Sequence, residues 1–283
     1  HWHALVAIHA CQSGKDVYCQ KPLAYTITEG LAVARAVRDN NRVFQIGSQQ
    51  RSSKEFQDAI ALVRAGKIGH IEKIYARVGE PPKPLDLPEM DVPGNLNFNQ
   101  WMGPLNDPKI HYHPDLCPPI SLEPEQNGEV VGGMGAGIRK PGNGYTADWG
   151  AHMFDIAQAA IGMDGSGPVE FIPKGYEGTE YATMKYANGI VMTEQPYRED
   201  NANAQGIKFI GDKGWLKVAR GYIECSDPSL LPKEEKKVGK GEYEVSSPHM
   251  QNFIDCVRSR RNPIAPVEVG CSTNTLAACK HCP

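Results

Sequence analysis

The sequence lacks any apolar run that approaches the ~20 residues needed for a membrane-spanning helix, so we expect no membrane partner. It also lacks long blocks of one charge. The formal net charge is −3, and Lys233, Lys236 and Lys237 are interleaved with Glu234 and Glu235. That pattern is typical of a solvated turn rather than a basic surface, so nucleic acid is not an expected partner either.

The chain has no initiator methionine and no signal-peptide pattern at its start. Its first residues, HWHALVAIHACQSGK, read as the middle of a helix, with Ala4, Leu5, Ala7 and Ile8 on one side. A chain that opens inside an element is expected to be a fragment or a processed product. The sequence does not distinguish a cytoplasmic from a periplasmic protein, because any export signal would lie upstream of residue 1.

Disulfide staples are not expected, because 283 residues can build a sizeable core without them. The eight cysteines are predicted to be mostly reduced, buried thiols. Cys279 and Cys282 have CxxC spacing, with Cys271 and His281 nearby, but a zinc site needs a second tight ligand pair that the sequence lacks. We therefore expect a helix that the end of the chain cuts off, and no metal site.

Helix and strand patterns alternate over the first fifty residues. Residues 16–23 predict a short strand, and residues 42–47 predict the next one. Between them, Thr26 or Thr28 can cap a helix over LAVARAVRDNN, with Glu29 in its first turn. Helices and strands at this spacing indicate a parallel α/β sheet.

The rest of the chain predicts a different architecture. Ser53 can cap a helix over KEFQDAIALVRAG, and IEKIYARVGE follows as a strand. Half of the 22 prolines lie between Pro81 and Pro124 with aromatic residues among them, which predicts a long ordered loop. A largely antiparallel sheet, with a hairpin signal at Asn188-Gly189, and an amphipathic helix should follow. Its strands are predicted at VEFIPKG, EYATMKYA, GIVMTEQPY, QGIKFIGD and GWLKVARGYIEC, and the helix at HMQNFIDCVRSRRNP.

One glycine-rich stretch, residues 132–137, is superficially similar to a dinucleotide-binding loop. A GxGxxG pattern that starts at Gly133 would need Gly or Ala at Ile138, and one that starts at Gly135 would need it at Lys140. The residues that follow, RKPGNG, cannot open a helix to hold a pyrophosphate. We interpret the stretch as a flexible loop beside a site.

Two positions carry candidate chemistry. Lys21 ends a predicted strand, and the carboxyl ends of strands line the ligand crevice of open α/β sheets, although a surface lysine is the alternative. In DWGAHMFD, helical spacing would put Asp148, His152 and Asp155 on one face. That face is either part of a catalytic site or the place of a buried histidine satisfied by a neighbouring aspartate.

Four separated motifs resemble the glucose-fructose oxidoreductase/inositol dehydrogenase/MocA family of nicotinamide-dependent oxidoreductases. They are HWHALVAIHACQSGKDVYCQKPL, QIGSQQRSS, WMGPL and DWGAHMFDIAQ, and the resemblance runs from His1 to about Val269. It implies an α/β fold, with the C-terminal part of a Rossmann domain over residues 1–48. An α+β domain with an open, largely antiparallel sheet, which binds substrate and mediates homo-oligomerisation, is implied over residues 49–283.

The resemblance also implies roles for individual residues. Lys21 would contact the reacting hydroxyl, His152 would be the acid/base, and Asp148 would orient the histidine or bind substrate. The implied cofactor is NAD or NADP, and the implied substrate is a small carbohydrate or polyol. The cofactor-binding residues would be His1, Trp2, His3, Gln20, Lys21, Pro22, Gln49, Arg51 and Trp101, and the substrate-binding residues Lys21, Tyr145, Asp148 and His152.

The sequence departs from the family pattern in two ways. Gln20 replaces a glutamate, which removes a charge beside Lys21. The GxGxxG motif and the acidic ribose-binding residue are absent and would lie upstream of His1, so we expect weak dinucleotide binding by the chain as given. The alternatives to a sugar or polyol dehydrogenase are an NAD-dependent glycoside hydrolase of the same family and a non-catalytic binding or assembly subunit.

Overall fold

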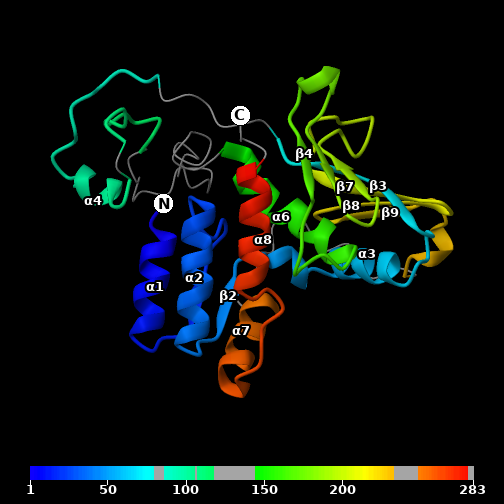
Figure 1. Ribbon diagram of the computed structural model, residues 1–283, viewed down its shortest axis with the longest axis horizontal. Helices are drawn as coiled ribbons and strands as arrows, with labels where there is room; N and C mark the ends of the chain where they lie inside the picture. Colours follow the sequence, from blue (N-terminus) through cyan, green and yellow to red (C-terminus); the bar gives the residue numbers. More distant parts are fainter. Residues whose placement is uncertain (80–85, 106, 118–143, 233–247, 280–283) are drawn as a thin grey trace, which may run out of the picture.

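The computed structural model describes residues 1–79, 86–105, 107–117, 144–232 and 248–279 (Figure 1). The predicted glycine-rich loop at 132–137 and the CxxC at Cys279–Cys282 lie wholly or partly outside these residues. No helix in the described ranges is long and apolar enough to cross a membrane.

The first part of the chain forms a small parallel α/β unit. Its elements are α1 His3–Gln12, β1 Val17–Cys19, α2 Ile27–Asp39 and β2 Phe44–Ile46, and β1 pairs with β2 in parallel with Val17 opposite Phe44. The predicted alternation of helix and strand is therefore confirmed.

Local sequence explains where these helices begin and which face they bury. Thr26 caps α2 through a capping box, in which its side chain accepts from the Glu29 N–H and the Glu29 carboxylate accepts from the Thr26 N–H. In α1, Ala4, Ala7 and Cys11 are buried, whereas Leu5 is 38% exposed, so the buried face is narrower than predicted.

The end of the chain returns to this unit. Helix α7 Pro248–Ser259 and helix α8 Val267–Cys279 follow the sheet, and α8 lies beside α2 and α6 (Figure 1). Val267 and Val269 share one hydrophobic cluster with Val33 and Ile46. The core of the first unit thus contains residues from both ends of the sequence, and the predicted boundary at residue 48 stays a prediction.

The second part is built on a seven-stranded sheet with the order β4-β5-β6-β3-β7-β8-β9. Only the pairing of β3 with β6 is parallel, so the sheet is largely antiparallel, as predicted. The strands are β3 Ile71–Arg77, β4 Glu170–Ile172, β5 Thr183–Lys185, β6 Val191–Thr193, β7 Gly206–Gly211, β8 Gly214–Ala219 and β9 Tyr222–Cys225.

Two helices cover one face of this sheet. They are α3 Lys54–Arg64 and α6 Gly144–Ala160, and Figure 1 shows α6 between the sheet and α8. Ile74, Phe209 and Leu216 of the sheet pack with Phe154 of α6 in the main hydrophobic core. Ser53 precedes α3 as predicted, but its side chain makes no capping hydrogen bond.

Two predicted segments differ in detail. GWLKVARGYIEC forms two strands rather than one, because Gly221 adopts a left-handed φ of 65° and turns the chain between β8 and β9. Within the proline-rich region, α4 Phe98–Met102 is helical, and the Phe98 ring stacks on Trp101. Short 3₁₀ turns are η1 Gln49–Ser52, η3 Tyr176–Gly178 and η4 Pro228–Leu230.

Candidate active site

Helix α6 carries the residues singled out in DWGAHMFD. Its buried residues run almost without interruption from Gly150 to Ala160, because α6 is covered by the sheet on one side and by α8 on the other. Asp148 and Trp149 are half-buried, and His152 is only 4% exposed. The predicted polar stripe therefore runs from the half-buried Asp148 to the buried His152 and Asp155.

Lys21 reaches α6 from the far end of the sequence. It follows β1, and the Lys21–Pro22 peptide bond is cis. Its Nζ forms an ion pair with Asp148 Oδ1 and lies 3.5 Å from the Asp148 carbonyl oxygen. Both side chains keep about a fifth of their surface exposed, at 20% and 21%, so the pair stays accessible to a ligand.

His152 is the buried base of this group. No described residue hydrogen-bonds its Nδ1. Burial lowers the pKa of His152 well below its ordinary value, and the neighbouring side chains of Lys21, Arg220 and His249 lower it further. The imidazole is therefore neutral at pH 7 and can accept a proton.

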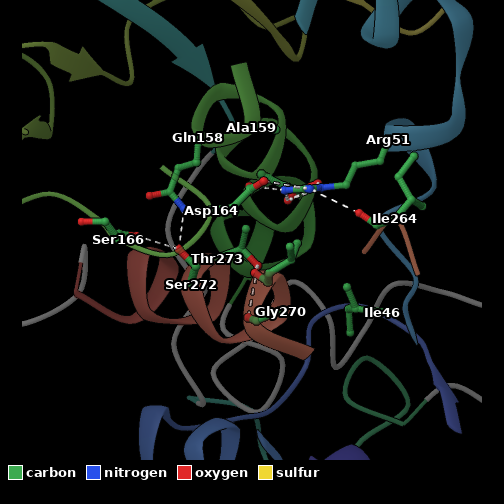
Figure 2. Close-up of polar contacts among 12 residues, drawn as sticks. Ile46, Arg51, Gln158, Ala159, Asp164, Ser166, Ile264, Gly270, Ser272 and Thr273 are labelled. Carbon is green, nitrogen blue, oxygen red and sulfur yellow. Dashed lines mark hydrogen bonds and ion pairs between the residues drawn. The ribbon is translucent and has the colours of Figure 1, made fainter. Parts of the chain in front are cut away.

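Asp155 does not join this site. It is fully buried one turn further along α6, and its Oδ1 accepts from Nη2 of Arg51 at 2.7 Å and from Nε at 2.9 Å. Arg51 also donates to Asp164 at 2.6 Å and lies 3.4 Å from the carbonyl oxygen of Ile264 (Figure 2). Asp155 therefore pairs with Arg51, not with His152 or Lys21.

The interpretation of His152 as a histidine satisfied by an aspartate is wrong. Asp148 is paired with Lys21, and Asp155 is paired with Arg51. Neither carboxylate orients the imidazole in this structure. Of the two implied roles of Asp148, binding of substrate is the one that stays a prediction.

Several of the predicted cofactor residues contact one another, and His3 contacts the residue that follows Lys21. His1 Nε2 is 2.7 Å from the Trp101 carbonyl oxygen, and the His1 and Trp101 rings meet edge to face at 5.1 Å. Trp2 Nε1 donates to the same carbonyl at 3.1 Å. His3 Nδ1 is 2.7 Å from the carbonyl oxygen of Pro22, and burial lowers its pKa.

Three other predicted site residues, Gln20, Gln49 and Tyr145, lie against different parts of the structure. Gln20 packs so closely on Gly47 that a Cβ there would lie 2.6 Å from Gln20 Oε1. Gln49 begins η1 and lies near Tyr18 of β1. Tyr145 lies in the first turn of α6 and packs against Gly79, which follows β3.

The guanidinium of Arg51 pairs with the carboxylates of Asp155 and Asp164. Its implied contact with the cofactor stays a prediction.

The structure adds three residues that the sequence did not single out. The Trp149 ring meets His152 edge to face at 6.1 Å between centroids, and Arg220 Cζ lies 4.6 Å from the Trp149 centroid. His249 is fully buried, with Nδ1 2.9 Å from Ser52 Oγ and Nε2 2.9 Å from the Ile46 carbonyl oxygen. Trp149 lies inside one of the motifs that resemble the family. No local sequence pattern indicates that Arg220, in the β8–β9 turn, or His249, in α7, belongs to the site.

A nicotinamide cofactor is implied by the resemblance, and the residues present fit one end of it. His152 leaves a buried ring nitrogen without a partner among the described residues, and Ser48 after β2 has a buried hydroxyl in the same condition. Such buried polar atoms are expected to have partners. No group of three or more described His, Cys, Asp or Glu side chains is arranged to hold a metal ion.

No family model matches the chain. It is similar to levoglucosan dehydrogenase of Pseudarthrobacter phenanthrenivorans, with 38% identity over 71 residues, 25% of this chain and 18% of that protein. It is also similar to inositol 2-dehydrogenase of Salmonella typhimurium, with 34% identity over 76 residues, 26% of this chain and 23% of that protein. The matched segment thus spans about a fifth of each relative.

Similarity to solved structures covers far more of the chain. A levoglucosan dehydrogenase in complex with NADH and levoglucosan superposes with a TM-score of 0.60 at 17% identity, over 98% of this chain and 74% of that one. The chain therefore has the fold of that dehydrogenase structure. The relatives and this structure confirm the resemblance to the glucose-fructose oxidoreductase/inositol dehydrogenase/MocA family.

Proposed function

We propose that this chain serves an NAD(P)-dependent oxidoreductase that acts on a secondary alcohol of a sugar, cyclitol or related polyol. The observation that carries the proposal is the accessible Lys21–Asp148 ion pair next to a buried, neutral His152. The relatives named above, which act on inositol and levoglucosan, support the same substrate class.

The residues divide the chemistry of alcohol oxidation between them. Neutral His152 takes the proton of the reacting hydroxyl as general base. Lys21 Nζ donates a hydrogen bond to the same oxygen and stabilises its developing negative charge. Asp148 holds the ammonium of Lys21 in place and accepts from a neighbouring substrate hydroxyl. The nicotinamide cofactor, when bound, supplies the hydride acceptor.

Cofactor contacts are assigned to the group that surrounds Lys21. His3 contacts Pro22, which follows Lys21, and Gln20 precedes Lys21 in the chain. His1 and Trp2 both contact Trp101. These residues would face the nicotinamide end, because the carboxyl ends of β1 and β2 open toward them. The described residues contain no glycine-rich strand–turn–helix for the phosphates, so the assignment concerns that end alone.

A homo-oligomer through the sheet is part of the proposal. The face of the sheet away from α3 and α6 carries Tyr75, Lys208, Trp215 and Lys217, and both lysine ammonium groups lie over the Trp215 ring, at 5.5 and 4.5 Å. Apolar ring surface framed by lysine stems on an open sheet is suited to pairing with a second copy.

The test is to supply the purified protein with NAD⁺ or NADP⁺ and a panel of polyols, among them myo-inositol and levoglucosan. A dehydrogenase forms one equivalent of NAD(P)H for each alcohol oxidised. An NAD-dependent glycoside hydrolase, which the same Lys21 and His152 could serve, releases sugar from a glycoside with no net NADH. A binding subunit does neither, and the Lys21, Asp148 and His152 arrangement argues against it because binding alone requires no general base.

A further inference from the structure

Gln50 carries a buried side-chain amide that no described residue satisfies. It lies in η1, shortly after β2, and is only 3% exposed. Neither its Oε1 nor its Nε2 has a hydrogen-bond partner in the part of the chain that the structure describes. An amide that stays buried and unpaired costs free energy, so buried amides are almost always paired. Gln50 is therefore suited to a ligand group that offers one acceptor and one donor together.

Other buried polar atoms occur close to Gln50 in the sequence, in β2 and directly after it. The Oε1 of Gln45 in β2 and the hydroxyl of Ser48 also have no hydrogen-bond partner among the described residues. Gln45 is partly satisfied, because its Nε2 donates to the His249 carbonyl oxygen at 2.7 Å. Gln50 differs in that both polar atoms of its side chain are unpaired. It is thus the residue of this segment with the strongest requirement for a partner.

The backbone around Gln50 is held close to the candidate active site. The next residue, Arg51, pairs with Asp155, and His152 lies one turn before Asp155 on α6. The Gln50 carbonyl oxygen accepts from the Ser53 N–H at 3.1 Å, which closes the turn of η1. An amide that starts from an anchored backbone loses less freedom when it pairs with a ligand.

Gln50 and Lys21 follow strands that end at the same edge of the parallel sheet. Strands β1 and β2 pair with Cys19 opposite Ile46, and Lys21 and Ser48 each come two residues later. In open α/β sheets, ligands bind in the crevice outside the carboxyl ends of the strands. The segment of Gln50 therefore leaves the sheet at the edge to which the proposed function assigns the nicotinamide.

We propose that the side chain of Gln50 binds the carboxamide of the nicotinamide cofactor. This inference rests on the proposed function, which requires that cofactor. A carboxamide has one C=O acceptor and one NH₂ donor, as the glutamine amide does, so the two groups match in a pair of hydrogen bonds. Gln50 Nε2 donates to the carboxamide oxygen, and the carboxamide nitrogen donates to Gln50 Oε1. The reacting hydroxyl of the substrate is a poorer match, because Lys21 and His152 already serve it.

The proposal links cofactor binding to stability. Without cofactor, the amide of Gln50 is buried and unpaired, so an apolar side chain of similar length should be neutral or stabilising there. With the carboxamide bound, the same substitution removes two hydrogen bonds. Gln50→Met should therefore keep or raise the stability of the cofactor-free protein and weaken the binding of the cofactor.

The experiment uses the purified protein with NAD⁺, NADP⁺ and the 3-acetylpyridine analogue of each. The methyl ketone of the analogues keeps the acceptor of the carboxamide and lacks its NH₂ donor. Calorimetry measures the binding of each probe to the unaltered protein, Gln50→Met and Gln251→Met, and thermal melting measures stability without cofactor. Gln251→Met is the matched control, because Gln251 is exposed on α7 and its Nε2 donates to Asp255.

We expect the unaltered protein to bind NAD⁺ or NADP⁺ about 10-fold more tightly than the matching analogue, roughly the effect of one lost hydrogen bond. Gln50→Met should remove this preference, and its melting temperature without cofactor should be equal or up to about 2–4 °C higher. Gln251→Met should change neither quantity. Equal binding of cofactor and analogue by the unaltered protein, a preference that survives Gln50→Met, or a lower melting temperature of Gln50→Met would overturn the proposal.

The two proposals can fail separately. Oxidation of polyols with equal affinity for NAD(P)⁺ and its analogue would retain the dehydrogenase and reject the contact of Gln50 with the carboxamide. A preference for NAD(P)⁺ that depends on Gln50, with no NAD(P)H formed from any polyol, would retain that contact and reject the dehydrogenase.

Discussion

Lys21 and Asp148, 127 positions apart in the chain, form an ion pair that joins the end of β1 to the N-terminal half of α6. The pair bridges the parallel unit and the helix that lies on the sheet. Its position decides which chemistry is available, because it puts an ammonium donor beside the buried imidazole of His152.

Replacement of His152 by alanine should lower kcat by about 10²–10⁴-fold, the usual contribution of a general base. The imidazole is the neutral, buried proton acceptor of the site, and alanine cannot take its place. Steady-state rates of NAD(P)H formation measure the loss. His9→Ala, an exposed histidine of α1, is the control and should leave the rate unchanged. A loss smaller than tenfold would remove His152 from this role.

Replacement of Lys21 by methionine should lower kcat by about 10²–10³-fold, as expected for loss of one donor to a developing oxyanion. Asp148→Asn should cost less, because it keeps the shape and one acceptor oxygen while the ammonium stays in place. Rates of the two single variants and the double variant give the coupling between them. Lys185→Met, an exposed lysine paired with Glu170, is the control. Strictly additive effects of the two changes would argue against a joint role.

The lowered pKa of His152 predicts how stability depends on pH. The unfolded chain binds a proton near the ordinary pKa of 6.5, whereas the folded site resists it down to a lower pH. Between these two values the unfolded state holds more protons, so the free energy of unfolding falls as pH falls, by up to about 1.4 kcal/mol per pH unit for one group. Half-buried His3 and fully buried His249 have pKa shifts in the same direction.

Urea unfolding at pH values from 8 to 5 measures this dependence. His152→Asn should flatten the curve below pH 6.5, because it removes one of the groups that resist protonation. His9→Asn should leave the curve unchanged. Identical slopes for the His152→Asn variant and the unaltered protein would show that His152 titrates alike in the folded and unfolded states.

Sequence patterns were sufficient to predict the elements that residues close to one another in the sequence stabilise. The helix after Thr26 begins where the capping box predicts it, because both partners of that box lie within four residues. The turn at Asn188-Gly189 forms as predicted, with Gly189 at a φ of 89°. In the candidate site, the motifs indicated Lys21 and His152, and the structure brings both to one place.

Contacts between distant segments could not be predicted in this way. Nothing near Arg220 in the sequence indicates that a turn between strands will place it over Trp149. Similarly, the seven-residue spacing of Asp148 and Asp155 suggested one face, but the first meets Lys21 and the second meets Arg51. Helical spacing determines the direction of a side chain, whereas tertiary packing determines its partner.

We expect the Arg51–Asp155 pair to stabilise the fold. Asp155 is fully buried and Arg51 is 8% exposed, and their hydrogen bonds join η1 to α6. Burial raises the pKa of Asp155, while the Arg51 guanidinium opposes that rise. Arg51→Ala should therefore lower the free energy of unfolding by about 3–5 kcal/mol, because it leaves a buried carboxylate without its partner.

Urea unfolding of Arg51→Ala, Asp155→Ala and the double variant tests this structural role. The double variant should be less destabilised than the sum of the two single variants, because it leaves neither charge buried alone. Arg260→Ala, whose exposed guanidinium pairs with Asp16, is the matched control and should cost about 1 kcal/mol or less. If Arg51→Ala instead kept full stability and only weakened NAD(P)⁺ binding, Arg51 would be a cofactor residue as the family resemblance implies, and the buried pair would contribute little to the fold.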